Sequence, residues 1–402
     1  MEMKKIEILC ATAVLAAFTT DAAAEFLLSN RLRLGYDDNI YQTEKNKKES
    51  FRLVDEIEAT LNEVLDNTYL GITYRPSVLW VEARSDDEVD ILHNLNFNLI
   101  QEFTPRLTLD LSDTLRAGQL PELMDNGYIV REDEDNIYNA ALASLMYEFR
   151  PGTRLDLAGR WLTLRYTDEW KDPETGKDLH DYDNYNSGVV GLSLRQQLGT
   201  LTTVSGDLRY QTLKYEDSPD GFNRDSDMVF AGLGAEQTFS PSLLGSLRAG
   251  AEWREYKDSD AYDDQTKPYV EGSVTWMPTP ATRLTLSASY SIYESDITNY
   301  MSQNRTYASL SLAHDFSSRL HFYCSAAYTH GEYEEEYANK NMEGLKGGDE
   351  DSAIFGARLA YQVAPRNWLE LNYQFITLDS DVEGRQSYDN NRVDVAWKIQ
   401  IL

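Results

Sequence analysis

Cysteine, histidine and long apolar segments are all scarce in this sequence. Of its 402 residues, 2 are cysteine and 5 are histidine, and the mean hydropathy is -0.52. No cysteine–histidine cluster has the spacing of a zinc site. Beyond the first residues, no segment approaches the roughly 20 apolar residues of a transmembrane helix. These absences exclude a zinc-stabilised fold and a membrane protein built from helices.

Positive charge is scarce as well. Lysine and arginine together number 37, against 67 aspartates and glutamates, so the formal net charge is -30. Such an acidic chain repels phosphate backbones, and we therefore expect no nucleic-acid partner. Net charge does not determine a fold, so the architecture has to be inferred from the order of the residues.

The N-terminal residues predict a secretory signal. Met1–Ile6 is basic, Ile8–Phe18 is apolar, and Asp21–Glu25 contains an Ala-x-Ala cleavage site. The apolar part is too short for a membrane anchor. We predict that residues 1–24 are a signal peptide and that residues 25–402 form an outer-membrane β-barrel. The mature chain would have a net charge of -29, because the signal has two basic and three acidic residues, and its one cysteine could form no internal disulfide.

The stretch from Tyr269 to Glu294 shows the pattern that dominates the mature chain. Apolar and polar residues alternate up to Trp276, a turn containing prolines follows, and the alternation resumes at Arg283. A period of two predicts strands with one apolar and one polar face, and two such strands around a tight turn form a hairpin. The hairpin recurs along the chain with no helix of comparable length to cover it. A sheet repeated this often has to close on itself, because open edges aggregate.

We therefore predict an all-β fold, a transmembrane antiparallel up-and-down β-barrel of about 18 strands, with 16 as the lower bound. The predicted strands are 27–37, 50–63, 67–84, 89–103, 106–116, 137–149, 153–166, 185–199, 201–215, 227–239, 242–256, 268–277, 282–294, 304–316, 319–331, 352–363, 366–378 and 391–401. Pro76 lies inside one of these ranges and cannot donate to a ladder, so we expect a bulge there.

The connections between the strands alternate in length and charge. Short turns such as 151–153 and 278–280 alternate with long acidic segments such as 117–136 and 332–351. Short turns on one side and long loops on the other are typical of the periplasmic and extracellular sides of an outer-membrane barrel. The 26 tyrosines fit the same interpretation, because amphipathic rings collect at membrane interfaces. A secreted β-sandwich or propeller is the soluble alternative, but it predicts turns of similar length on both sides.

The segment Gly35–Tyr41, Gly-Tyr-Asp-Asp-Asn-Ile-Tyr, resembles the opening signature of the putative beta-barrel porin-2 family. The layout of repeated hairpins with proline turns extends this resemblance over nearly the whole mature chain. The family consists of bacterial outer-membrane barrels that are often associated with exopolysaccharide systems. The resemblance implies a location in the bacterial outer membrane, with membrane lipids and the outer-membrane assembly machinery as partners. One departure is the C-terminus, Lys398–Leu402, which lacks the usual final aromatic residue.

Charged side chains on the polar face of the strands are the candidate functional residues. On a lipid face, an arginine near the midplane would cost roughly 2–4 kcal/mol, so these side chains should point into the lumen. The lumen-lining candidates are Arg106, Arg116, Arg154, Arg160, Arg195, Arg209, Arg248, Glu252, Arg254, Arg283 and Arg358. They could pair with acidic groups across neighbouring strands and merely stabilise a polar interior. Alternatively, they line a water-filled channel and offer forked donors to anionic groups of a solute.

Two further possibilities arise from the loops and the histidines. The acidic segments 131–136, 332–336 and 348–351 could hold divalent cations, but none has the spacing of an EF-hand, and solvated loops are the simpler interpretation. His314 and His330 lie on the apolar phase near strand ends, as in an outer-membrane hydrolase. The sequence contains no Gly-x-Ser-x-Gly motif, and a girdle position explains both histidines. We predict no catalytic residue, no metal site and no cofactor.

Together these observations predict a porin-like channel that passes a saccharide, an exopolysaccharide or another small polar solute. The alternatives are a non-conducting structural or binding barrel with a plugged lumen and acidic surface loops, and an outer-membrane hydrolase.

Overall fold

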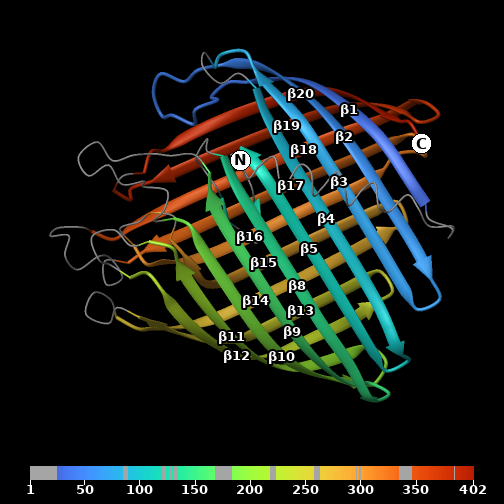
Figure 1. The fold of residues 1–402 in the computed structure, drawn as a ribbon, viewed down its shortest axis with the longest axis vertical. Helices are drawn as coiled ribbons and strands as arrows, with labels where there is room; N and C mark the ends of the chain where they lie inside the picture. Colours follow the sequence, from blue (N-terminus) through green and yellow to red (C-terminus); the bar gives the residue numbers. More distant parts are fainter. Residues whose placement is uncertain are drawn as a thin grey trace.

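The alternating segments form an antiparallel sheet of 18 strands that closes on itself, and Figure 1 shows the resulting barrel. The computed structural model describes residues 25–84, 89–119, 124–125, 128–129, 135–167, 183–217, 223–257, 263–295, 297, 300–334, 346–383 and 385–402. The last strand pairs with the first, so the sheet has no free edge. The predicted signal peptide, residues 1–24, lies outside the described residues. Among these residues there is no helix long and apolar enough to cross a membrane.

Each of the predicted strand ranges corresponds to one strand of the barrel. The barrel strands are β1 (Glu25–Asp37), β2 (Ser50–Leu65), β3 (Thr68–Val81), β4 (Val89–Thr104), β5 (Leu107–Gln119), β8 (Asp135–Arg150), β9 (Thr153–Tyr166), β10 (Tyr185–Leu198), β11 (Thr202–Tyr215), β12 (Ser226–Ser240), β13 (Leu243–Tyr256), β14 (Gln265–Thr279), β15 (Thr282–Glu294), β16 (Ser302–Asp315), β17 (Leu320–Tyr333), β18 (Gly348–Ala364), β19 (Asn367–Ser380) and β20 (Tyr388–Gln400). Two short strands, β6 (Met124–Asp125) and β7 (Tyr128–Ile129), pair with each other in the connection between β5 and β8.

The two faces of the strands separate apolar from polar side chains, as the alternation predicted. Leu233 is 73% exposed and Leu286 is 49% exposed on the outward face, whereas Glu252 on the inward face is 3% exposed. In the part of the chain that the structure describes, no element covers this outer surface. Burying it in a membrane removes the apolar side chains from water, which stabilises the inserted state.

Pro76 does not cause the predicted bulge. Glu56 pairs with Ser77 and Ala59 pairs with Tyr74, so the register of β2 and β3 is the same on both sides of the proline. The two pairs between them are missing from the ladder. Proline therefore removes local pairing, because it lacks an N–H donor, without inserting an extra residue.

The connections are asymmetric in the structure as well, and Figure 1 shows the short turns at one end of the barrel and the long connections at the other. Gly152 and Gly199 lie in two of the short turns with φ of 82° and 73°, a conformation that glycine adopts without steric cost. The acidic segment Gly348–Asp351 is not a loop, since it forms the start of β18. At the C-terminus, the Ile401 N–H donates to the Leu28 carbonyl at 2.7 Å, so the final residues take part in closing the barrel.

Candidate functional site

One hairpin end leaves the barrel wall and crosses to the inside. The pairing of β14 with β15 ends at Val270 and Tyr290, and the rest of β15 pairs only with β16. Pro268 lies two residues N-terminal to Val270 on β14, and it has no N–H with which to continue the β14–β15 ladder. We call residues 291–295 and 300–305 the inward hairpin. Continued through the predicted strand 282–294, the alternation puts Ile292 on the outward apolar face with Leu286, and this prediction is wrong, because Ile292 is 4% exposed and lines a cavity.

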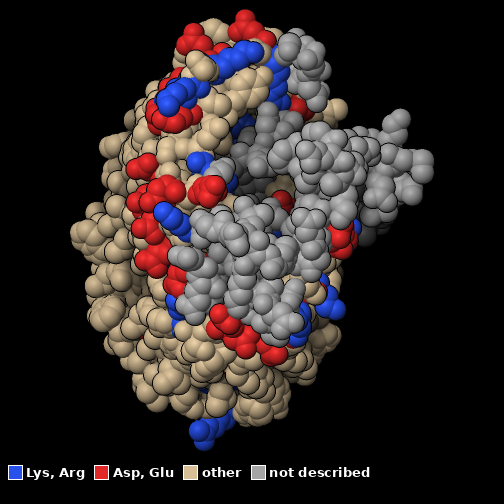
Figure 2. Space-filling model, turned by 90° about the vertical axis from the view of Figure 1, so that its left-hand side faces the viewer, with Lys and Arg blue, Asp and Glu red and all other residues tan. Residues whose placement is uncertain are grey.

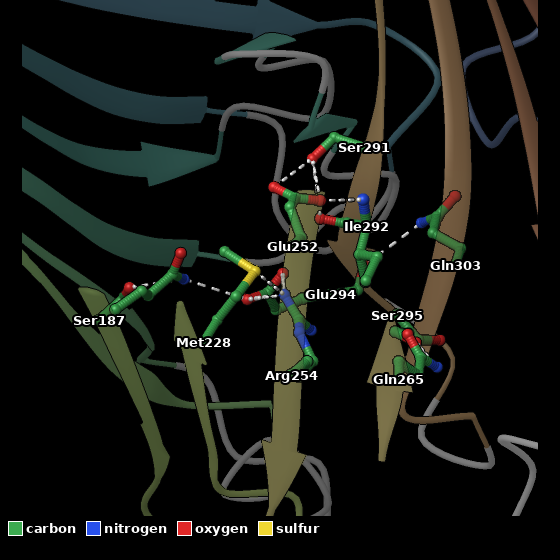
Figure 3. A network of polar contacts seen from close by, with 12 residues as sticks. Ser187, Met228, Glu252, Arg254, Gln265, Ser291, Ile292, Glu294, Ser295 and Gln303 are labelled. Carbon is green, nitrogen blue, oxygen red and sulfur yellow. Dashed lines mark hydrogen bonds and ion pairs between the residues drawn. The ribbon is translucent and has the colours of Figure 1, made fainter. Parts of the chain in front are cut away.

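Glu252 fixes the first strand of the inward hairpin. It lies on the inward face of β13, and its carboxylate accepts hydrogen bonds from Ser291 Oγ at 2.9 and 3.0 Å and from the Ile292 N–H at 3.0 Å, as Figure 3 shows. The Ile292 N–H would otherwise be an unsatisfied donor, since β15 has left its neighbour.

Glu294 fixes the hairpin at a second point through a buried ion pair. Arg254 Nη2 donates to both oxygens of Glu294 at 3.3 and 3.4 Å, and Gln211 Nε2 donates to one of them at 3.3 Å. Arg254 is 2% exposed and Glu294 is 8% exposed. Breaking a buried pair of this kind leaves an uncompensated charge, so the hairpin is held firmly against β11 and β13.

The far end of the inward hairpin packs on the end of the neighbouring strand β17 and on the connection after β19. Tyr300 is fully buried and its ring lies edge-on to that of Tyr333, with centroids 5.3 Å apart. Val382, in the connection after β19, completes this apolar cluster. On the β13 and β14 side, Tyr256 Oη and Gln265 Nε2 both donate to Ser302 Oγ, at 3.1 and 2.8 Å. The hairpin is therefore fixed on one side to β11, β13 and β14, and on the other to β17 and the connection after β19.

A cavity of about 820 Å³ lies beside the inward hairpin, inside the barrel. It is lined by inward side chains of β5 and β8 to β16, including arginines from four strands and several tyrosines. Its predicted lining residues are Arg116, Arg160, Arg209, Glu252 and Arg254. A volume of several hundred Å³ with convergent polar groups is typical of a site for a small ligand.

Arg209 is held by aromatic rings instead of by a carboxylate. Its guanidinium lies 3.9 Å from the ring centroid of Phe230 and 5.0 Å from that of Tyr269. No described carboxylate lies within ion-pair distance of it. The ring faces are attracted to the cation, so the side chain is positioned beside the cavity without an ion pair to a described carboxylate.

Two further arginines surround Tyr138 on the same side of the cavity. The Arg116 guanidinium lies 5.5 Å from the Tyr138 ring centroid, and Arg160 Nη2 donates to Tyr138 Oη at 3.5 Å. Both contacts join neighbouring strands, because Tyr138 pairs with Arg116 in the ladder and lies on the strand beside β9. We call the inward residues of β5 and β8 to β11 that line the large cavity the cavity wall.

On the opposite side of the barrel, the inward arginines form ion pairs with carboxylates. Arg52 binds both oxygens of Asp394, at 2.9 to 3.2 Å, and Arg31 binds Glu56 at 2.8 Å and Glu370 at 3.2 Å. Further pairs there join Arg33 to Glu56, Arg75 to Glu58 and Lys398 to Glu58. We call the inward face of β1 to β3, β19 and β20 the paired wall. Here the cross-strand pairing that the sequence left as one alternative is present.

The remaining predicted lumen residues lie outside the large cavity. Arg195 and Arg248 line a second, smaller cavity, where Arg195 pairs with Glu236 and Arg248 pairs with Asp207 and Glu271. Arg154 pairs with Asp156, two residues along its own strand. Arg283 and Arg358 are exposed inward residues of β15 and β18, and Arg106 is exposed in the turn before β5.

The aromatic residues of the cavity and the path of the inward hairpin were not predicted from the sequence. Tyr138, Tyr185 and Tyr269 lie on the inward phase, where alternation could have located them, but tyrosine was assigned to the membrane interfaces. The connection after β15 has a single acidic residue, Asp296, and contains Ile297, Tyr300 and Met301, and this composition is the signal that could have indicated a buried segment. The two histidines considered for hydrolysis bind other partners: His314 Nδ1 is 2.8 Å from Thr282 Oγ1, and His330 Nδ1 is 2.8 Å from Asp351.

Carboxylates surround the end of the barrel that carries the long connections. Figure 2 shows Asp and Glu side chains gathered around this end, with Lys and Arg interspersed. Of the acidic segments proposed for cations, 131–134 and 335–336 lie outside the described residues. No group of three or more potential metal-binding side chains occurs in the part of the chain that the structure describes.

Comparison with known sequences and structures identifies one family. The family described as Putative beta-barrel porin 2 matches residues 175–401. No curated protein matches the sequence. Similar solved structures include Pseudomonas aeruginosa OccK2 (OpdF) in complex with glucuronate, with 12% identity over 94% of this chain and 99% of that chain and a TM-score of 0.49. Acinetobacter baumannii OccAB3 has 14% identity over 94% of this chain and 100% of that chain, with a TM-score of 0.47. These likenesses are too distant to indicate a solute.

Proposed function

This chain belongs to the putative beta-barrel porin 2 family and is a porin-like channel of the bacterial outer membrane, through which we propose that saccharides carrying carboxylate groups pass. The family match and the barrel architecture favour a channel over the outer-membrane hydrolase that the sequence left as an alternative. Its proposed partners are the lipids and the assembly machinery of that membrane. The proposal for the solute rests on the cavity beside the inward hairpin.

The observation that carries this proposal is the environment of Arg209. A guanidinium that is held by two rings and has no described carboxylate partner keeps its positive charge beside the cavity, and this charge attracts the carboxylate of a solute. Arg116 and Arg160 add positive charge on the same wall.

Aromatic rings beside these arginines favour a saccharide over a simple carboxylic acid. Tyr138, Tyr185, Tyr269 and Tyr293 all line the cavity. A sugar ring has an apolar C–H face and a hydroxyl rim, so it can pack on a tyrosine face while its hydroxyls bind water and polar side chains. The inward hairpin limits the space, which suits an oligosaccharide or one extended polymer strand.

Single-channel conductance of the refolded protein in a planar bilayer tests the proposal. We expect an oligouronate to block the current at lower concentration than a neutral oligosaccharide of the same length. Arg209→Ser should remove this difference, whereas Lys398→Ser, which removes a cation from the paired wall, should retain it. Equal block by both sugars in the unmodified protein would contradict the assignment of anionic saccharides and leave the channel itself intact.

A further inference from the structure

The outward face of the barrel differs between its first and its later strands. On β9 to β20, no outward residue that lies at least four positions from both ends of its strand is an Asp, Glu, Lys, Arg, Asn, Gln or His. The outward residues in these central parts of the strands include Val190, Leu208, Leu247 and Leu371. This part of the barrel therefore has the continuous apolar band that lipid requires.

On β1 to β5 and β8, the same band is interrupted by five polar residues. They are Asn30, Asp55, His93, Asp113 and Asn139. All belong to the outward phase, because their ladder neighbours on that face are apolar residues such as Leu32, Val78 and Leu115. We call these five residues the polar belt.

The polar belt lies within the apolar band and not at its edge. Asp113 is flanked two positions away on the same face by Leu111 and Leu115, and Asp55 is flanked by Leu53 and Ile57. The five residues lie between four and seven positions from the long-loop ends of their strands, so they occupy similar depths. An interfacial girdle would instead have polar residues only beyond the last apolar position.

Hydrogen bonds within the belt reduce the cost of its polar groups. Asn30 Nδ2 donates to Asp55 Oδ1 at 2.6 Å, and Asn139 Nδ2 donates to Asp113 Oδ1 at 2.8 Å. His93 Nδ1 lies 2.8 Å from the hydroxyl of the adjacent Tyr74. Each carboxylate still has acceptor capacity that lipid tails cannot satisfy, and polar groups at such positions are expensive unless protein covers them.

We propose that the outward face of β1 to β5 and β8 is covered by the same face of a second copy of this chain. A second copy inserted in the same orientation holds its belt at the same depth. A two-fold axis along the membrane normal then brings polar groups opposite polar groups and apolar groups opposite apolar groups, as an isologous interface requires. A different partner would need a matching belt of its own.

The dimensions of this face agree with such an interface. Six strands spaced about 4.8 Å apart span roughly 30 Å, and the apolar band is about 25 Å tall, which gives about 750 Å² on each copy. A standard protein interface buries about 800 Å² per partner. Ala59, Ala141 and Ala143 are outward residues near the belt, and small side chains allow two membrane proteins to approach closely.

Oxidative cross-linking in native outer membranes tests the interface. In a Cys324→Ser background, Leu95→Cys places a thiol near the middle of the face on β4, and Leu286→Cys places a matched thiol on the outward face of β15. We expect a disulfide-linked dimer of this chain for Leu95→Cys and none for Leu286→Cys. Dimers from both variants, no dimer from either, or a product that contains another protein would overturn the proposal.

A second variant separates the role of the belt from folding. Asp55→Leu combined with Asp113→Leu makes the band more apolar, so the monomeric barrel should remain folded and resist denaturation in detergent at room temperature. Analytical ultracentrifugation in detergent should show that the dimer dissociation constant rises roughly tenfold, since each polar contact inside a membrane contributes modestly. An unchanged dissociation constant, or a monomeric unmodified protein, would overturn the assignment.

Discussion

The paired wall and the cavity wall lie on different sides of the barrel and both contain inward-facing arginines, yet these arginines have different partners. On the paired wall, Arg52 and Arg31 bind carboxylates of adjacent strands. On the cavity wall, Arg209 lies on two aromatic rings. The difference teaches that an inward arginine indicates a polar lumen, but only its cross-strand neighbour decides whether its charge is neutralised or available to a solute.

The largest effect is expected from breaking the paired wall. Arg52→Ala leaves Asp394, which is 7% exposed, without its bidentate partner, and should lower the free energy of unfolding by about 3 kcal/mol. Urea unfolding of the refolded barrel would measure this. Replacing the pair together, by Arg52→Met and Asp394→Leu, should restore much of the stability. A single variant as stable as the unmodified protein would show that this pair has no structural role.

Removing the charge of the cavity wall should change selectivity. The triple variant Arg116→Ser, Arg160→Ser and Arg209→Ser should shift the reversal potential in a salt gradient toward cations and raise the blocking concentration of an oligouronate by about tenfold or more, because charge-assisted hydrogen bonds are lost. The matched control removes the exposed Arg106, Arg283 and Arg358, which carry the same total charge. Equal shifts in both variants would mean that the cavity is not the selective part of the path.

Removing the Glu252 contact that holds the inward hairpin should change the conductance and lower the stability moderately. Glu252→Ala deprives Ser291 Oγ and the Ile292 N–H of their acceptor, which costs about 1–3 kcal/mol. The hairpin should then be less firmly held beside the cavity, and single-channel currents should be larger and noisier. Glu236→Ala removes an exposed carboxylate of β12 and serves as the control. Identical currents in both variants would show that the hairpin does not limit the path.

The smallest effect is expected from a conservative change on the cavity wall. Arg209→Lys retains the charge but loses the planar group that lies on Phe230 and Tyr269, so oligouronate binding should weaken by about 1 kcal/mol. Block by a small inorganic anion should hardly change, because it depends on charge alone. A loss as large as that of Arg209→Ser would indicate that the forked geometry, and not the charge, dominates recognition.

The buried position of Ile292 could not be predicted from the alternation of the sequence. The alternation of β15 continues through Tyr290 and Ile292 without a break, and it correctly places Leu286 on the outward face. Beyond Tyr290, the strand follows its contacts with Glu252 and Arg254 on β13, about 40 residues earlier in the chain. A local period cannot report such a contact, because it depends on which side chains the closed barrel brings opposite the hairpin.

The sequence alone determined the strands, their two faces, the asymmetric connections and the closure of the sheet, because side-chain alternation and turn chemistry are local properties of the chain. It also placed charged residues on the inward phase, since a charge on the outward apolar face is costly. Only the tertiary structure decided which arginines are neutralised, where the hairpin leaves the barrel wall and which outward strands carry a polar belt at one depth. These features depend on the register between strands, which brings together residues hundreds of positions apart in the chain, such as Arg52 and Asp394.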